Sequence, residues 1–176
     1  MISVVIATYN SEKYIIQQLE SIVQQTRNVD EVIIQDDCST DNTINVVKEF
    51  IKNNNLINWK IESNLQNKGY ISTFKEAIKR SNGDIIILCD HDDEWVSNKV
   101  EIIEKSFNEN DNVLVLATSF IKIDENGNEI PVKKKMGRSN NNLIRRSLKK
   151  GQINKMSLRD IAIYNITPGC TCAFSS

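Results

Sequence analysis

Apolar residues follow two alternating patterns along the first 125 positions of the chain. Short continuous runs rich in branched side chains are typical of strands covered on both faces. These runs occur at residues 3–7, 32–34, 85–88 and 113–117. Trp59 and Ile61 alternate with charged residues, which indicates a shorter strand nearer the edge of a sheet.

Apolar residues at helical spacing fill the stretches between these runs and predict amphipathic helices. Their apolar stripes consist of Ile15, Leu19, Ile22 and Val23; Ile44, Val47 and Ile51; Ile71, Phe74 and Ile78; and Val100, Ile103 and Phe107. Asn10 with Ser11, and residues 39–41, are expected to cap the first two helices, because short polar side chains accept free N–H groups there. Alternating strands and helices of this length pair in parallel through right-handed crossovers. The predicted fold is therefore α/β, a three-layer α/β/α arrangement with a mainly parallel central sheet and residues 85–88 as a central strand.

Charge divides the chain into two regions of opposite sign. The net charge of −1 combines 22 acidic and 12 basic side chains in residues 1–132 with one acidic and 10 basic side chains in residues 133–176. We predict a core domain at 1–130, and a basic connecting segment with the start of a further portion at 131–176. The basic stretch from Lys133 to Arg159 suits either a solvated face or a surface for anionic lipid headgroups or a phosphate-bearing acceptor. It lacks aromatic residues, which argues against nucleic acid as a partner.

No apolar run approaches the roughly 20 residues that cross a bilayer. The opening MISVVIATYN lacks a basic leader, so it is interpreted as a strand and not as a secretion signal. These features predict a cytoplasmic protein with reduced cysteines, placed at most peripherally on the inner face of the cell membrane. Cys170 and Cys172, with His91 as the sole histidine, do not supply a four-ligand zinc site.

Polar clusters follow three of the predicted strands. Residues 8–10 follow the first strand, residues 35–37 end the second, and residues 90–94 follow the central one. In open α/β sheets, ligands bind at the carboxyl ends of the strands. Each cluster alone is also compatible with helix capping, but their common position predicts one ligand site.

The third cluster, DHDDEW, carries four carboxylates in five residues, namely Asp90, Asp92, Asp93 and Glu94. Two unit charges about 4 Å apart repel by roughly 4 kcal/mol at an effective dielectric near 20, so a divalent cation is the expected offset. Oxygen ligands of this kind favour Mg²⁺ or Mn²⁺ shared with a diphosphate. A calcium-binding helical hand is excluded, because that loop needs glycine where Trp95 stands. Ligation by His91 stays open, and Trp95 is expected to pack beneath the loop.

Four ordered segments resemble those of family 2 glycosyltransferases, particularly bacterial rhamnosyltransferase-like members. They are SVVIATYNSEKYI, EVIIQDDCSTDNT, NLQNKGY and SNGDIIILCDHDDEW, with a weaker match at NITPGCTCAF. The resemblance implies a GT-A fold that binds a nucleoside-diphosphate sugar. It also implies substrate-binding roles for Thr8, Tyr9, Asn10, Glu12, Asp37, Asn67, Gly69, Asp90 and Asp92, and metal binding by Asp92 and Asp93. Within this set Tyr9 would offer its ring to a pyrimidine base, and Thr8 and Asp37 would contact base and ribose.

The resemblance further implies inverting transfer of a sugar from a UDP- or dTDP-sugar to a polysaccharide or lipid-linked acceptor in cell-surface glycan synthesis. One carboxylate base would deprotonate the acceptor hydroxyl, and it is expected beyond Ser176, so residues 1–176 are expected to bind donor without full transfer activity. A sugar nucleotidyltransferase is a weaker alternative, because its glycine- and arginine-rich loop is missing. A non-catalytic regulatory module is another weak alternative, because Asp36 with Asp37 only superficially resembles a phospho-acceptor site. No G-x-G-x-x-G follows the first strand, which excludes a dinucleotide-dependent oxidoreductase.

Overall fold

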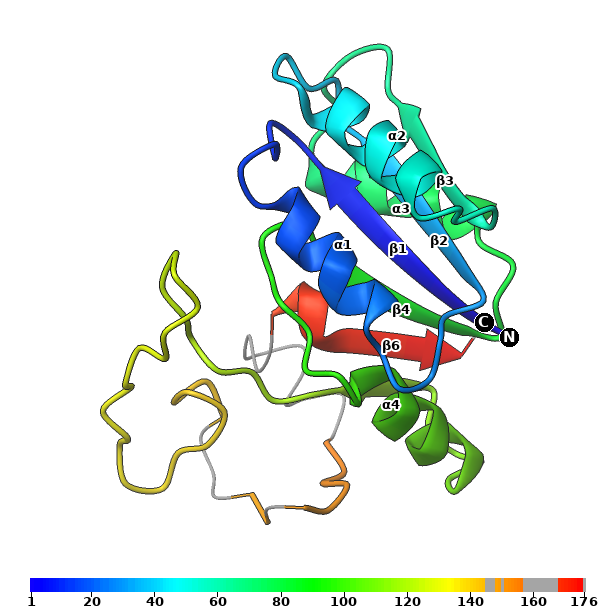
Figure 1. The fold of residues 1–176 in the computed structure, drawn as a ribbon. Helices are drawn as coiled ribbons and strands as arrows, with labels where there is room; N and C mark the ends of the chain where they lie inside the picture. Colours follow the sequence, from blue (N-terminus) through cyan, green and yellow to red (C-terminus); the bar gives the residue numbers. More distant parts are fainter. Residues whose placement is uncertain (145–147, 150, 157–167, 176) are drawn as a thin grey trace. The chain divides into compact units, whose positions relative to one another are not determined.

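A computed structural model describes residues 1–144, 148–149, 151–156 and 168–175 and has the predicted α/β organisation (Figure 1). Its strands are β1 (Ile2–Thr8), β2 (Glu31–Asp36), β3 (Trp59–Ser63), β4 (Ile85–Asp90), β5 (Val115–Ala117) and β6 (Cys172–Ser175). Its helices are α1 (Ile15–Val23), α2 (Thr43–Asn53), α3 (Tyr70–Arg80), α4 (Lys99–Asn108) and the short 3-10 helix η1 (Gly169–Thr171). Part of the predicted basic stretch, Ser176, and the first residues of NITPGCTCAF lie outside the described residues.

The strands form one sheet in the order β3-β2-β1-β4-β6-β5. The pairs β1–β2, β1–β4 and β2–β3 are parallel, whereas β4 and β6 are antiparallel. Every residue of β1 and β2 is buried, as expected for strands whose apolar runs are covered on both faces. The predictions of a mainly parallel sheet, a central position for β4 and an edge position for β3 are confirmed.

Helices cover the two faces of the sheet unequally. The larger apolar cluster joins β1, β2 and β4 to residues of α1, α2 and α4, among them Leu19, Val47 and Ile103. A smaller cluster places Ala77 of α3 on Val5, Ile33 and Ile86 at the opposite face. Figure 1 shows α3 behind the sheet and α1 and α2 in front of it. The predicted three-layer arrangement is confirmed.

The first two helices begin later than the sequence suggests. The residue before α1 is Tyr14 and the residue before α2 is Asn42, and neither accepts a capping hydrogen bond with its side chain. The prediction that Asn10 and Ser11 cap α1 is therefore wrong. Asp41 does accept the N–H of Thr43, the first residue of α2, at 3.0 Å. The polar residues before both helices bind neighbouring loops instead, as described below.

The chain divides into two compact units. The first comprises Met1–Leu116 with the segment from Ala173, and the second comprises Ala117–Cys172. In the second unit an isolated antiparallel bridge joins Ile123 and Glu129. The boundary predicted at residue 130 stays a prediction. Within the described part of the chain, no helix has the length and apolar content needed to cross a membrane.

Candidate functional site

The carboxyl ends of β1 to β4 lie in register along one edge of the sheet. Thr8 pairs with Asp36, Asp36 with Ser63, and Ala7 with Asp90. The polar residues that follow these strands therefore emerge side by side. This arrangement agrees with the expectation that residues 8–10, 35–37 and 90–94 share one rim.

Asp36 is a fully buried anchor at this rim. Its Oδ1 accepts hydrogen bonds from the hydroxyls of Thr8, at 3.0 Å, and Ser39, and its Oδ2 accepts from the Ser39 N–H and the Ser63 hydroxyl, both at 2.9 Å. A buried carboxylate is costly unless such donors surround it. Thr8, which was expected to contact the nucleotide, is only 2% exposed and holds the end of β1 to β2.

Asp37 fixes the turn that precedes α3. Its Oδ1 accepts from Nδ2 of Asn64 and the N–H of Lys68, and its Oδ2 accepts from the N–H of Gly69, each at 2.8 Å. Burial acts to raise the pKa of Asp37, but the hydrogen bonds from Lys68, Asn64, Thr73 and Gly69 outweigh it and hold that pKa below its usual value. The carboxylate is therefore ionised and held in place before any ligand binds.

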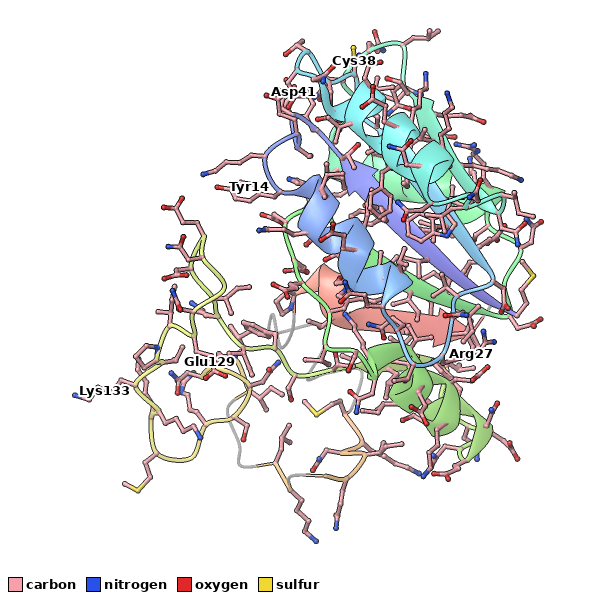
Figure 2. All side chains as sticks on the ribbon, viewed as in Figure 1. Tyr14, Arg27, Cys38, Asp41, Glu129 and Lys133 are labelled. Carbon is pink, nitrogen blue, oxygen red and sulfur yellow. The ribbon has the colours of Figure 1, made fainter. Side chains whose placement is uncertain are left out.

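Asn10 and Glu12 connect the loop after β1 to the loop after β2. Oδ1 of Asn10 accepts the N–H of Thr40 at 2.9 Å, and Oε2 of Glu12 accepts the N–H of Asn42 at 2.7 Å. In return, the N–H of Glu12 donates to Oδ2 of Asp41, which lies in the loop at the top of Figure 2. Asn10 adopts a φ of +50°, a left-handed conformation that asparagine tolerates better than most residues. The structure thus gives both predicted site residues a loop-bracing contact.

Tyr9, Asn67 and Gly69 are three further exposed residues of the predicted set at this end of the first three strands. Tyr9 is 45% exposed, so its ring is accessible from solvent. Oδ1 of Asn67 accepts the N–H of Gly69 at 3.2 Å. Gly69 has a φ of +80°, which explains glycine at this position, and no atom lies within 4 Å of where a Cβ would be. The backbone at Gly69 is therefore open to close approach.

The acidic residues after β4 lie in a short loop at the same edge. Asp90 and Asp93 are half-buried and Asp92 is exposed. Among the described residues, no three His, Cys, Asp or Glu side chains converge closely enough to hold a metal ion by themselves. Oxygen donors from one or two carboxylates nevertheless fit the way in which Mg²⁺ is held together with substrate phosphates. A cation here would depend on phosphate oxygens for its remaining ligands.

The model of glycosyl transferase family 2 matches residues 3–174. The chain belongs to this family. A glycosyltransferase of Methanococcus voltae, named as a dolichyl N-acetylglucosaminyl phosphate diacetamido-dideoxy-glucuronosyltransferase, is 34% identical over 131 residues, which cover 71% of this chain and 40% of the relative. Since the named relatives include other sugar transferases, the rhamnosyltransferase-like part of the prediction is only approximate.

Solved structures of other glycosyltransferases share the fold. Residues 1–349 of Staphylococcus aureus TarS, in a complex with UDP-GlcNAc, match with a TM-score of 0.64 and 30% identity over 78% of this chain and 38% of that one. A mannosyltransferase of Pyrobaculum calidifontis, in a complex with GDP-Man and Mn²⁺, matches with a TM-score of 0.62 and 20% identity over 69% of this chain and 35% of that one, which shows the fold alone. The expected GT-A fold is confirmed. The chain spans about two fifths of the length of these proteins or less.

In this family 2 chain, Trp95 and Lys99 follow the acidic loop and contact each other. Trp95 is 6% exposed, as expected, and the ammonium of Lys99 lies 4.1 Å from the centre of its ring. Burial raises the pKa of the neighbouring Cys89 thiol. The positive charge of Lys99 lowers this pKa, and the carboxylates of Asp93, Asp90 and Asp92 raise it. The charges of the loop are thus close enough to act on a thiol at the end of β4.

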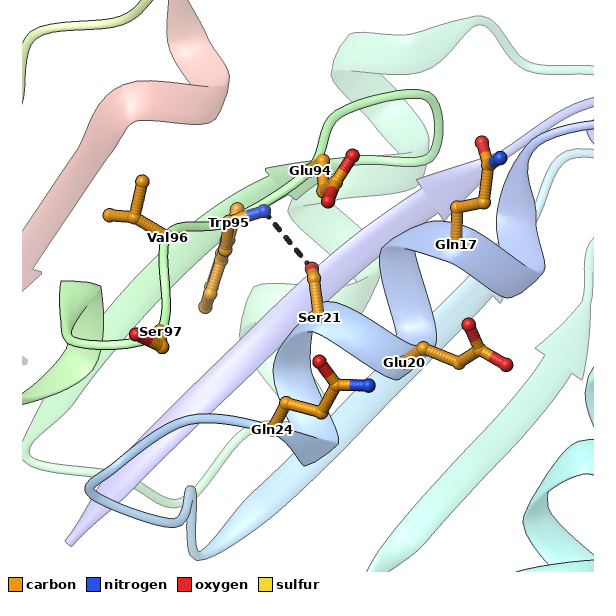
Figure 3. A pocket seen from close by; sticks show the side chains of 8 residues that line it. All are labelled: Gln17, Glu20, Ser21, Gln24, Glu94, Trp95, Val96 and Ser97. Carbon is orange, nitrogen blue, oxygen red and sulfur yellow. Dashed lines mark hydrogen bonds between the residues drawn. The ribbon is translucent and has the colours of Figure 1, made fainter. Parts of the chain in front are cut away.

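A shallow hollow lies between α1 and the segment that follows the acidic loop (Figure 3). It is lined by Gln17, Glu20, Ser21, Gln24, Glu94, Trp95, Val96 and Ser97. The N–H of Trp95 donates to Oγ of Ser21 at 3.1 Å and fastens this segment to α1. None of the substrate- or metal-binding residues predicted from the sequence lines the hollow, which meets the acidic loop only at Glu94.

Sequence reasoning did not identify Gln35 and Asn64 as important individually. Both are buried polar residues that belong to the hydrogen-bonding surroundings of Asp37. Asn64 lies within an asparagine-rich segment after an edge strand, a context that resembles an ordinary turn. The useful signal in the sequence was the single glutamine that ends the apolar run of β2.

Proposed function

We propose that this chain is the nucleotide-sugar-binding part of an inverting glycosyltransferase. The complete enzyme would move a sugar from a UDP- or dTDP-sugar to a polysaccharide or lipid-linked acceptor in cell-surface glycan synthesis. The observation that carries the proposal is the common rim at which accessible Tyr9, the fixed Asp37–Gly69 turn and the acidic loop meet. The 30% identity to TarS, whose structures contain UDP and UDP-GlcNAc, supports the donor class.

The roles at the nucleotide end follow from exposure and rigidity. Tyr9 offers an accessible ring for stacking on a pyrimidine, and Gly69 leaves its backbone open to the nucleotide. Asp37 and Thr8 contribute a fixed base and ribose pocket, in which Oδ2 of Asp37 accepts the N–H of Gly69. Asn10, Glu12 and Asn67 border the same pocket and keep its loops in place.

At the phosphate end, Asp92 and Asp93 would hold Mn²⁺ or Mg²⁺ together with the diphosphate. Asp92 would also face the ribose, and Asp90 would contribute to donor binding. The ion would stabilise the negative charge that develops on the leaving diphosphate. No general base is assigned within residues 1–176, and we place it in the acceptor-side portion. We further propose a cytoplasmic location, with the basic stretch from Lys133 to Arg159 at an anionic inner membrane face.

Isothermal titration calorimetry with UDP and dTDP, each with and without Mn²⁺, tests the donor site. Wild-type chain should bind at least one nucleotide, with a metal-dependent gain in affinity. Asp93→Ala should remove that gain, whereas Asp111→Ala, which removes an exposed acid just beyond α4, should retain it. Absence of metal-dependent binding in the wild type would refute the proposed function, and a retained gain in Asp93→Ala would refute the role of Asp93.

A further inference from the structure

A chain of hydrogen bonds runs from the last turn of α3 to the carboxylate of Asp37. Nη1 of Arg80 donates to Oε1 of Gln35 at 2.7 Å, and Nε2 of Gln35 donates to Oδ1 of Asn64 at 3.1 Å. Nδ2 of Asn64 then donates to Oδ1 of Asp37 at 2.8 Å. These four residues form what we call the amide relay. It joins a cation at one end to a carboxylate at the other through two side-chain amides.

The relay lies beneath α3 because of the alternation of β2. Ile33 faces Ala77 of α3 in the smaller apolar cluster, and Gln35, two residues further along the strand, points to the same face. Gln35 is 4% exposed and Asn64 is 9% exposed. A buried amide is destabilising unless both its donor and its acceptor are bonded. Each amide here meets that requirement through its neighbours in the relay.

The two ends of the relay impose a single direction on its hydrogen bonds. A guanidinium can only donate, so the atom of Gln35 that faces Arg80 must be its oxygen. Its nitrogen then faces Asn64, which must accept with its own oxygen. The nitrogen of Asn64 is left to donate to Asp37, which as a carboxylate can only accept. The orientation of both amides therefore follows from the charges at the ends.

A second contact supports the same orientation of Asn64. Its Nδ2 lies 3.3 Å from Oγ1 of Thr73, and that hydroxyl donates its own proton to the carbonyl of Gly69 at 3.0 Å. The carbonyl of Gly69 and the carboxylate of Asp37 are both acceptors, so whichever of them takes the hydroxyl proton, Thr73 can only accept from Asn64. Both N–H groups of Asn64 thus have partners, and one of them is Asp37.

We propose that Arg80 is a positioning residue of the donor site. Through Gln35 and Asn64, Arg80 holds the carboxylate of Asp37 in the orientation that fixes the turn at Lys68 and Gly69. This inference rests on the proposed function, because the turn is part of the proposed nucleotide pocket. Arg80 itself does not touch the pocket: it sits at the last position of α3, and its other guanidinium nitrogen forms an ion pair with Glu62.

The side-chain amide of Asn64 tests the relay in the free protein, without any nucleotide. In ¹H–¹⁵N spectra of chain 1–176, Arg80→Met should shift the Asn64 and Gln35 side-chain NH₂ signals. Lys79→Met is the matched control, since it removes a neighbouring exposed cation from the same helix end. It should leave both signals in place, and Arg80→Lys should restore them in part. An unchanged Asn64 amide in Arg80→Met would overturn the relay.

UDP affinity in the presence of Mn²⁺ tests the consequence for the donor site. Arg80→Met should bind UDP about 5-fold more weakly than Lys79→Met, the loss expected for one net hydrogen bond. Equal affinities of the two variants, at a temperature where both are folded by circular dichroism, would overturn the positioning role. If the wild type binds no UDP while the Asn64 signal still responds to Arg80→Met, the relay stands and the proposed function fails, together with the role in the donor site.

Gln35→Glu separates positioning from simple packing. The new carboxylate keeps the shape of the side chain and its pairing with Arg80, but it offers Asn64 an acceptor where a donor stood. Asn64 must then turn its nitrogen toward position 35 and its oxygen toward Asp37, where two acceptors repel. UDP binding should weaken by about 10-fold or more, beyond the effect of Arg80→Met. A Gln35→Glu chain that binds UDP like the wild type would contradict the proposed direction of the relay.

Discussion

Replacing Asp36 with alanine should destabilise the fold far more than replacing it with asparagine. In the alanine variant the N–H of Ser39 and the hydroxyl of Thr8 lose their acceptor, whereas the hydroxyl of half-buried Ser39 can turn toward solvent. Ser63 retains the carbonyl of Asn64 at 3.2 Å as an alternative. Two orphaned donors at about 1–3 kcal/mol each, together with the lost charge-assisted bonds, give a loss of roughly 4 kcal/mol.

The asparagine variant should lose only about 1 kcal/mol, and the reason lies in how the partners are distributed. Both partners of Oδ1 are hydroxyls, from Thr8 and Ser39, and hydroxyls can accept from an amide nitrogen. The partners of Oδ2 include the backbone N–H of Ser39, and the amide oxygen can continue to serve them. In this orientation the new amide keeps a hydrogen bond to each neighbour, and only the hydroxyl protons of Thr8 and Ser39 must turn to another acceptor.

Urea unfolding of the wild type, Asp36→Ala, Asp36→Asn and the exposed control Asp111→Ala, followed by circular dichroism at pH 7, measures these differences. Unchanged m-values would confirm that the midpoints report stability. The control should stay within about 0.5 kcal/mol of the wild type. Two results would contradict this role of Asp36: similar losses for the alanine and asparagine variants, or a loss below about 1.5 kcal/mol for alanine. Either would mean that the donors bonded to Asp36 find another acceptor.

Three further predictions concern the loops and the strand ends. Glu12→Gln should leave the UDP affinity within about twofold of the wild type in calorimetry, because a glutamine oxygen can still accept the N–H of Asn42; a loss of tenfold or more would indicate a direct ligand role. The pKa of Asp37 is lowered in the folded chain, so its contribution to stability is present above the unfolded pKa near 3.8 and is lost as the pH falls below about 4. Over this pH range, the urea midpoint of Asp37→Asn should decline less than that of the wild type. Equal declines of the two midpoints would refute the assignment. Gly83→Ala should cost about 2–3 kcal/mol in urea unfolding, because its Cβ would lie 2.6 Å from the backbone nitrogen of Ser3, and a loss within the error of the measurement would show that the strand ends move apart freely.

The layered fold was predictable because burial on both faces leaves a local trace in the sequence. The runs of β1, β2 and β4 are continuous and branched, whereas Trp59 and Ile61 alternate with charged residues in β3 at the sheet edge. Patterns of this kind involve only residues that are close together in the sequence. The antiparallel pairing of β6 with β4 depends on a chain return of more than 80 residues, and no local pattern encodes it.

The rim of the site was predictable and its internal bonding was not. Polar residues directly after buried parallel strands had to meet at one edge, so the positions of Tyr9, Asp37 and Asp90 followed from the common direction of the strands. The capping prediction failed at Asn10 because a short polar side chain before a helix can also accept from another loop, here from Thr40, 30 residues away. The amide relay escaped prediction for the same reason, since Arg80 and Gln35 are separated by 45 residues.

On the proposed function, the two ends of the donor site differ in how far they are organised before binding. The carboxylate of Asp37 already accepts three hydrogen bonds at 2.8 Å, so the nucleotide meets a rigid pocket and loses little affinity to ordering. The acidic loop instead brings too few of its described ligands together to hold a cation alone. The diphosphate must therefore supply the remaining ligands of a cation held at Asp92 and Asp93. Linkage then requires that Mn²⁺ strengthen UDP binding by the same factor by which UDP strengthens Mn²⁺ binding. Substitutions in the amide relay should instead weaken UDP binding by the same factor in the presence and in the absence of the metal.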